Sequence, residues 1–242
     1  RWSDSIQDFS FYMYLFTVVL VMGAGNVVND YFDREIDLIN RPGKVIVGQV
    51  FSMKMTLGIY LGLNILAILL CTSWLIMCYV LSAMFMLWLY SYKLKKLPLV
   101  GNLVVSLLTF LSIYLVSFFL DVDYPVLIFA FLGACIQFLR EIIKDLEDIR
   151  GDKEGGCRTF PVLFGVPNTK LLIYMFAGIF ICSMLYWQWT LQKHIWSLYA
   201  VYYLLTVFVV KVFRASHKSH FTVLSSLLKM TMVVGLLTVL FV

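Results

Sequence analysis

Eight apolar stretches, each close to the length of a bilayer crossing, dominate the 242-residue chain. A helix needs about 20 mostly apolar residues to cross the hydrocarbon layer. In lipid every backbone amide needs an internal partner, and a helix supplies one within a single segment. The runs therefore predict an all-α, polytopic transmembrane bundle of eight helices that forms a single domain over residues 1–242. The expected crossings are residues 9–28, 55–71, 75–91, 101–120, 125–143, 171–190, 196–212 and 222–242.

The composition supports this prediction and excludes other classes of protein. Hydrophobic residues make up 62% of the chain and charged residues 14%, against about 45–50% and about 25% in soluble domains. The five cysteines include no C-x-x-C pair, so neither a disulfide framework nor a zinc site is indicated. The formal charge is +5, but the basic residues alternate with apolar runs. That distribution argues against a nucleic acid partner and for a membrane lipid environment.

The basic residues are distributed unevenly between the connections. The odd-numbered connections, counted from the first apolar run, carry 16 of the 19 lysines and arginines, whereas the even-numbered ones carry only Lys193. Because positively charged connections stay in the cytoplasm, the odd-numbered ones are predicted to be cytoplasmic. Two of them, residues 29–54 and 140–170, are longer than the others and are expected to be polar loops. Long polar loops in a compact bundle are usually functional.

The first of these connections opens with a regular set of polar residues. Asn29, Asp33 and Asp37 are four residues apart, with Asp30 beside them. On a helix, residues at this spacing project from one face. Like charges on one face repel each other unless a cation lies between them. This segment is therefore a candidate cation site.

The second long connection repeats the pattern. Its acidic residues again follow a three-or-four spacing and are Glu141, Asp145, Asp148 and Asp152. Mg²⁺ prefers oxygen ligands and is usually held by one or two carboxylates together with substrate phosphates. Two such faces are expected to hold a magnesium-bound diphosphate, with nearby lysines and arginines neutralising the remaining phosphate charge.

Other interpretations of the acidic segments are weighed beside this one. Solvated helix ends account for either segment alone more readily than for both together. The spacings fit neither an EF-hand nor a P-loop, and H-E-x-x-H is absent. A CDP-alcohol phosphotransferase lacks support because its D-G-x-x-A-R opening is missing. A transporter or cation channel would place its acids on broken helices at mid-membrane, whereas here they follow the apolar runs.

The two acidic segments resemble the signatures of the UbiA superfamily of intramembrane prenyltransferases. Residues 29–37 match N-D-x-x-D-x-x-x-D in full, and residues 145–152 match D-x-x-D-x-x-x-D. The stretch Tyr90-Ser91-Tyr92-Lys93 between them and residues 158–162 after the second are also similar to that family. The resemblance covers essentially the whole chain. It implies transfer of a prenyl group from a polyprenyl diphosphate to a lipophilic acceptor, with Mg²⁺ as cofactor.

The same resemblance implies roles for individual residues. The metal ligands it implies are Asn29, Asp33, Asp37, Asp145, Asp148 and Asp152. The catalytic aspartates it implies are Asp33, Asp37, Asp148 and Asp152. The substrate-binding residues it implies are Asn29, Asp30, Arg41, Lys44, Tyr92, Lys93, Asp145 and Arg158.

The acceptor is predicted from a narrower likeness. Residues 140–161 look most like the family members that prenylate geranylgeranylglyceryl phosphate in ether-lipid synthesis, with Phe160 as a small departure. Family members that prenylate aromatic acceptors in quinone, haem or chlorophyll synthesis share the general pattern and remain an alternative. The resemblance also implies nine helices, whereas eight are expected here.

Overall fold

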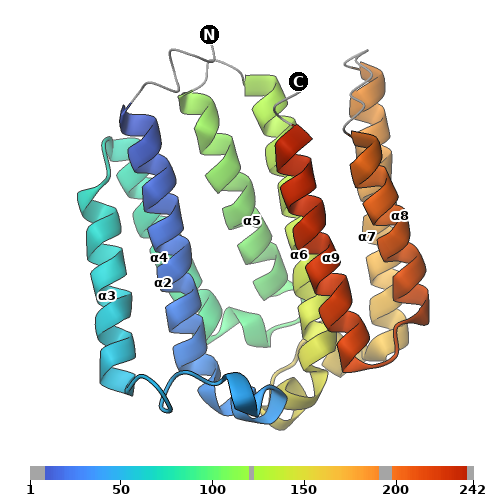
Figure 1. Cartoon of the computed structure of the whole chain (residues 1–242), viewed down its shortest axis with the longest axis horizontal. Helices are drawn as coiled ribbons and strands as arrows, with labels where there is room; N and C mark the ends of the chain where they lie inside the picture. The colour runs from blue at the N-terminus through green and yellow to red at the C-terminus, as the bar shows by residue number, and fades with distance from the viewer. Residues whose placement is uncertain (1–8, 120–122, 191–197, 239–242) are drawn as a thin grey trace.

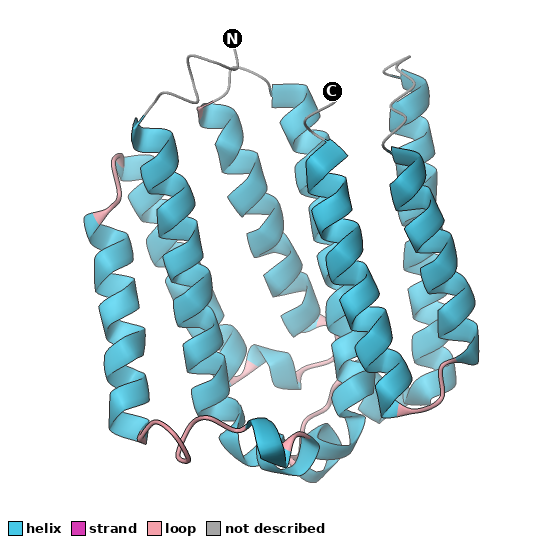
Figure 2. Ribbon diagram, in the orientation of Figure 1, coloured by secondary structure: helices cyan, strands magenta, loops and turns pink. Residues whose placement is uncertain are grey.

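Eight α-helices stand side by side in the computed structural model, which describes residues 9–119, 123–190 and 198–238 (Figure 1). They are α2 (Phe9–Asn40), α3 (Met53–Leu69), α4 (Trp74–Tyr92), α5 (Val100–Tyr114), α6 (Asp123–Glu154), α7 (Phe160–Thr190), α8 (Leu198–Arg214) and α9 (Lys218–Thr238). Three short 3-10 helices, η1 (Pro42–Lys44), η2 (Leu94–Lys96) and η3 (Leu115–Phe118), lie between them. Figure 2 shows no strand in the described ranges. The all-α, eight-helix prediction is confirmed.

In the described residues six helical segments are long and apolar enough to cross a membrane, and one of them is α5 together with η3, Val100–Phe118. The two other α-helices, α3 and α8, have 17 residues each. Large apolar side chains such as Trp74, Phe131 and Leu185 are exposed on the outer surface of the bundle. In lipid such exposure is favourable, because the hydrocarbon takes the place of a protein core. The chain is therefore a multi-pass integral membrane protein.

The interior of the bundle contains two groups of buried side chains. One joins α6 to α7, α8 and α9 and includes Ile142, Phe208 and Leu228, all fully buried. The other lies between α2, α3 and α4 and includes Tyr14 and Val80. Helix α6 contacts α5, α7, α9 and α2, so it is the central helix on which the bundle is assembled.

Two helices, α2 and α6, are 32 residues long and extend beyond the length of one crossing. The expectation of polar loops from residues 29 and 140 onward was wrong in this respect, because α2 continues to Asn40 and α6 to Glu154. The cause is that apolar residues continue the buried face of α6 between the acids, with Ile143 and Leu146 almost fully buried. Both acidic segments therefore lie on regular helix, at the same end of the bundle (Figure 1).

Candidate functional site

The acidic ends of α2 and α6 contact each other directly. Arg41, immediately after α2, donates to Glu147 Oε1 at 2.8 Å and lies 3.4 Å from Asp148 Oδ2. The Glu147 side chain is only 6% exposed. The Arg41 side chain is 35% exposed, so removal of Arg41 leaves a buried carboxylate without its cation, whereas removal of Glu147 leaves Arg41 in contact with water. This ion pair fixes the distance between the two acidic segments.

A second contact uses the backbone of α6. The side-chain amide of Asn40 accepts from Gly151 N–H at 3.0 Å and donates to the carbonyl of Asp148 at 3.3 Å. A Cβ on Gly151 would lie 2.3 Å from Asn40 Nδ2, which no real Cβ contact tolerates. Gly151 is therefore required for this approach. We refer to the paired hydrogen bonds between Asn40 and α6 as the Asn40 clamp.

The first acidic segment is organised around Asp33. Asn29 Nδ2 donates to Asp33 Oδ2 at 2.8 Å. Lys95, in η2, bridges Asn29 Oδ1 at 3.2 Å and Asp33 Oδ1. The side chains of Lys95 and Asp33 are 12% and 17% exposed, so the pair is largely shielded from water. The face predicted from the four-residue spacing thus includes a lysine from a different part of the chain.

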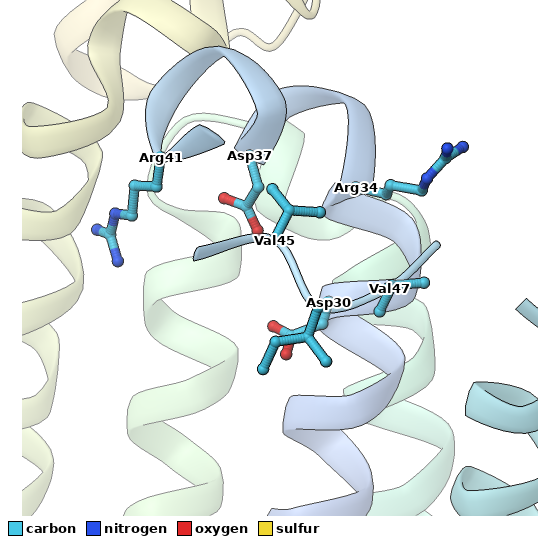
Figure 3. A pocket seen from close by; sticks show the side chains of 7 residues that line it. Asp30, Arg34, Asp37, Arg41, Val45 and Val47 are labelled. Atoms are coloured by element: carbon cyan, nitrogen blue, oxygen red, sulfur yellow. The ribbon is translucent and has the colours of Figure 1, made fainter. Parts of the chain in front are cut away.

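The neighbouring face of α2 borders a pocket covered by residues 45–51. Figure 3 shows Asp30 and Asp37 projecting from α2 toward the segment that carries Val45, while Arg34 and Arg41 extend to opposite sides. Val45 and Val47 are buried against α2, whereas Asp30 stays exposed and Asp37 is half-buried. Gly48 has a φ of +82°, and a Cβ there would meet Arg34 Nε at 2.6 Å. A glycine is therefore needed where the covering segment turns over the arginine.

The three aspartates of the second acidic segment each have a partner outside α6. Asp145 Oδ2 accepts from Asn102 Nδ2 of α5 at 2.8 Å. Asp152 Oδ2 accepts from the Thr159 hydroxyl at 3.2 Å. Lys218, at the start of α9, lies 3.6 Å from Asp148 Oδ1 and donates to the carbonyl of Asn40 at 2.8 Å. The second acidic segment is thus held in place by α2, α5, α9 and the start of α7.

Buried beside these aspartates is Glu141, whose side chain is 6% exposed. It accepts from Gln137 at 2.9 Å and from the Tyr90 hydroxyl at 3.4 Å. It also pairs with Arg140 at 3.0 Å and with Lys144 at 3.3 Å. One carboxylate therefore meets two cations and two neutral donors.

The carboxylates of the two helices are close enough to repel one another. Asp37 experiences the negative charges of Asp33 and Asp148, and Asp152 experiences those of Asp148 and Asp33. Repulsion across a shielded gap favours the binding of cations between the helices. Among the described residues, no three Asp, Glu, His or Cys side chains form a metal cage by themselves. The oxygen donors nonetheless fit Mg²⁺, because this ion usually completes its shell with water and substrate phosphates.

The remaining predicted residues lie in different positions around the site. Tyr92 and Lys93 are exposed, and the Tyr92 ring lies 5.7 Å from that of Phe32 on α2. Arg158 is exposed, and its backbone N–H donates to the carbonyl of Lys96 at 2.8 Å. The position of the Lys44 side chain lies outside what the structure describes. Tyr92, Lys93 and Arg158 make no contact with the aspartates among the described residues.

The segment that connects α6 to α7 carries Cys157 beside the aspartates. Burial raises the pKa of this thiol, and the negative charge of Asp152 raises it further. A thiol held in its neutral form is a poor ligand and nucleophile. Cys157 is therefore a packing residue of the site.

Several residues of the site were not predicted from the sequence. Lys95 meets Asp33, whereas the lysine that the resemblance implied in this stretch was Lys93, as a substrate-binding residue. Asn40 lies seven residues after Asp33 and so continues its face, which is a signal that the spacing contained. Asn102, Lys218 and other contacting residues lie on helices distant in sequence from the aspartates, and no pattern within one segment predicts their contacts.

Fold and site together define a multi-pass membrane protein in which two acid-rich helix ends face one another. The chain belongs to the UbiA prenyltransferase family, which matches residues 2–233. The family predicted from the two aspartate signatures is confirmed.

Known proteins resemble this chain both in sequence and in solved structure. A digeranylgeranylglyceryl phosphate synthase of Methanospirillum hungatei JF-1 is 38% identical over 188 residues, which cover 74% of this chain and 66% of that protein. A solved structure that concerns digeranylgeranylglyceryl phosphate synthase in membranes matches 94% of this chain and 83% of that one, with 26% identity and a TM-score of 0.69. A UbiA homologue from Archaeoglobus fulgidus, bound to DMAPP and Mg²⁺, has 14% identity over 95% of this chain and 87% of that one, with a TM-score of 0.69. The last likeness shows a shared fold.

Proposed function

We propose that the chain catalyses Mg²⁺-dependent transfer of a geranylgeranyl group from its diphosphate to the free hydroxyl of geranylgeranylglyceryl phosphate. The observation that carries this proposal is the direct contact between two acid-rich helix ends, with arginines and lysines between the carboxylates. Such an arrangement suits a magnesium diphosphate, which needs oxygen ligands for the metal and cations for the phosphates. The 38% identity to a digeranylgeranylglyceryl phosphate synthase supports this acceptor.

The proposed reaction exchanges one carbon–oxygen bond for another. The bond between C1 of the prenyl chain and the diphosphate breaks, and its electron pair leaves with the diphosphate. The acceptor oxygen forms an ether bond to C1, and the hydroxyl proton passes to solvent. Mg²⁺, when bound, would stabilise the charge that develops on the diphosphate. Arg34 and Arg41 border the pocket and are positioned to neutralise the rest of that charge.

We assign the metal to both acidic segments. The proposed ligands are Asn29, Asp33, Asp37, Asp145, Asp148 and Asp152, of which Asp33, Asp37, Asp148 and Asp152 are the proposed catalytic aspartates. The donor diphosphate is assigned to Asp30, Arg41, Lys44, Tyr92, Lys93 and Arg158, to which the geometry adds Lys95 and Arg34. Support comes from the pocket beside Asp30 and Asp37 and from the contact of Lys95 with Asp33.

The site is proposed to face the cytoplasm and to belong to a single domain spanning residues 1–242. The uneven distribution of lysine and arginine supports the cytoplasmic side, because the connections at the acidic end carry most of the positive charge. A prenyl tail attached at this end would extend between the helices, away from water.

The test is an assay of the purified protein in nanodiscs with Mg²⁺ and labelled geranylgeranyl diphosphate. Geranylgeranylglyceryl phosphate is offered as acceptor, and aromatic acids and quinone precursors are offered separately. We expect labelled ether lipid from the first acceptor and no product without Mg²⁺. An aromatic product would keep the chemistry but contradict the acceptor. Ion flux with no covalent product from any acceptor would contradict the proposed function altogether.

A further inference from the structure

Two cations on α6, Arg140 and Lys144, are assigned neither to the metal nor to the diphosphate in the proposed function. Arg140 and Lys144 both pair with the buried Glu141, and their side chains are 18% and 35% exposed. Arg140 Nε is buried without a hydrogen-bond partner among the described residues. Charges within a transmembrane segment are costly, by at least about 2.5–3.5 kcal/mol each, and usually mark a function. A single carboxylate does not account for both.

Their spacing shows which way they face. Arg140, Lys144 and Asp148 are four residues apart, so they follow one another along one face of α6. This face meets α2, because Arg41 contacts Asp148. Lys144 also lies near enough to Asp30 of α2 for their charges to attract. The two cations therefore face the gap between α2 and α6.

Their depth in the membrane differs from that of the aspartates. Four residues of helix rise about 6 Å, so Lys144 lies about one turn, and Arg140 about two turns, further into the bundle than Asp148. Arg34 and Arg41 border the pocket at the outer end of the gap. Arg140 and Lys144 thus form a set of cations separate from Arg34 and Arg41.

We propose that Arg140 and Lys144 bind the phosphate group of the acceptor lipid, an inference that rests on the proposed prenyl transfer. The acceptor carries a phosphomonoester on a three-carbon glycerol unit, and its only free hydroxyl lies on the same unit. Holding the phosphate about one or two turns further into the bundle than Asp148 brings this hydroxyl next to C1 of the donor. Guanidinium and ammonium groups are the usual partners of a phosphate. Glu141, held by Tyr90 and Gln137, positions the two cations.

The test measures binding, so that it does not depend on turnover. The protein in nanodiscs receives Mg²⁺ and an unreactive thiolo analogue of geranylgeranyl diphosphate. It is then titrated with a short-chain alkylglyceryl phosphate or with the matching alkylglycerol, which lacks the phosphate. Wild-type protein is expected to bind the phosphate form about tenfold more tightly or better, as two charge-assisted contacts imply. Equal affinity for the two compounds would overturn the inference without any variant.

Substitutions then locate the subsite. Lys144→Met leaves Arg140, Gln137 and Tyr90 on Glu141 and should weaken binding of the alkylglyceryl phosphate by about tenfold or more. Lys144→Arg should restore it. The control is Lys153→Met, the same substitution on the same helix at an exposed position. A merely structural role predicts equal loss of acceptor and donor binding, whereas we expect the loss of acceptor affinity to exceed any loss of donor affinity several-fold.

Failure of this inference is distinguishable from failure of the proposed function. If wild-type protein and Lys144→Met bind the alkylglyceryl phosphate equally while both bind the donor analogue with Mg²⁺, the subsite assignment is wrong and the proposed function stands. If wild-type protein does not bind the donor analogue with Mg²⁺, the proposed function is wrong and the inference falls with it.

Discussion

The two acid-rich helix ends differ in how their carboxylates are held. On α6, Asp145, Asp148 and Asp152 each meet a partner from another element, so their positions are fixed by α5, α2, α9 and the start of α7. On α2, Asp33 meets Lys95 of η2 and Asn29 of its own helix. Asp30 and Asp37 instead border a pocket beneath a short covering segment.

This difference suggests that the two acidic segments have different roles within one site. A fixed carboxylate provides a preorganised ligand, whereas a carboxylate beside an open pocket can adjust to what enters. We therefore expect changes on α6 to affect the geometry of the site and changes on the open face of α2 to affect what binds there.

The largest effect is expected from the acids themselves. Asp33→Asn and Asp148→Asn each remove one proposed metal ligand with little change of shape, and prenyl transfer should fall by about 10²–10³-fold or more. The folded protein should remain, as judged by thermal unfolding and gel filtration in detergent. Transfer at the wild-type rate in either folded variant would refute the assignment.

A smaller effect is expected from Lys95→Met, which leaves Asp33 buried without its cation. Donor binding should weaken by about tenfold to a hundredfold, and stability should fall by up to about 3–5 kcal/mol, because both side chains are largely shielded. Thermal unfolding and titration with geranylgeranyl diphosphate measure the two quantities. Lys54→Met is the matched control, since Lys54 is exposed at the start of α3. Equal behaviour of the two variants would mean that Lys95 is not part of the site.

The Asn40 clamp should matter more for stability than for binding. In Gly151→Ala the new methyl group displaces the Asn40 amide, so two hydrogen bonds are lost and the helix ends separate slightly. We expect destabilisation by about 1–3 kcal/mol, measured by thermal unfolding in detergent. Gly178→Ala is the control, because a Cβ there meets nothing within 4 Å. Equal stability of the two variants would show that the Asn40 clamp does not stabilise the protein.

The smallest effect is expected from Thr159→Val, which removes one hydrogen bond to Asp152 and keeps the shape of the side chain. Loss of this bond should cost about 0.5–1.5 kcal/mol and lower the transfer rate several-fold. In a titration with Mg²⁺, the variant should need a higher Mg²⁺ concentration than the wild type to reach half-maximal activity. An unchanged magnesium dependence would show that Asp152 needs no such support.

Features that repeat with the period of a helix could be predicted from the sequence, whereas contacts between distant segments could not. Eight apolar runs predicted eight helices, and the four-residue spacing after Asn29 predicted a shared face because α2 continues through it. The same spacing is typical of a helix, so polar loops should not have been expected at these positions. Both helices continue through the acidic segments and are therefore longer than expected. Lys95 was missed because it lies in a 3-10 turn, where neither helix nor strand periodicity tells which lysine points inward. Asn102 and Lys218 were missed because their partners are far away in sequence.

The central claim is that both helix ends together hold one magnesium prenyl diphosphate. The most direct measurement is the binding of labelled geranylgeranyl diphosphate to the protein in nanodiscs, with and without Mg²⁺, for wild type, Asp33→Asn, Asp148→Asn and the double variant. We expect Mg²⁺-dependent binding in the wild type and nearly the same large loss in all three variants, because neither end suffices alone. Losses that simply add in the double variant, or tight Mg²⁺-dependent binding that survives either single substitution, would contradict the claim.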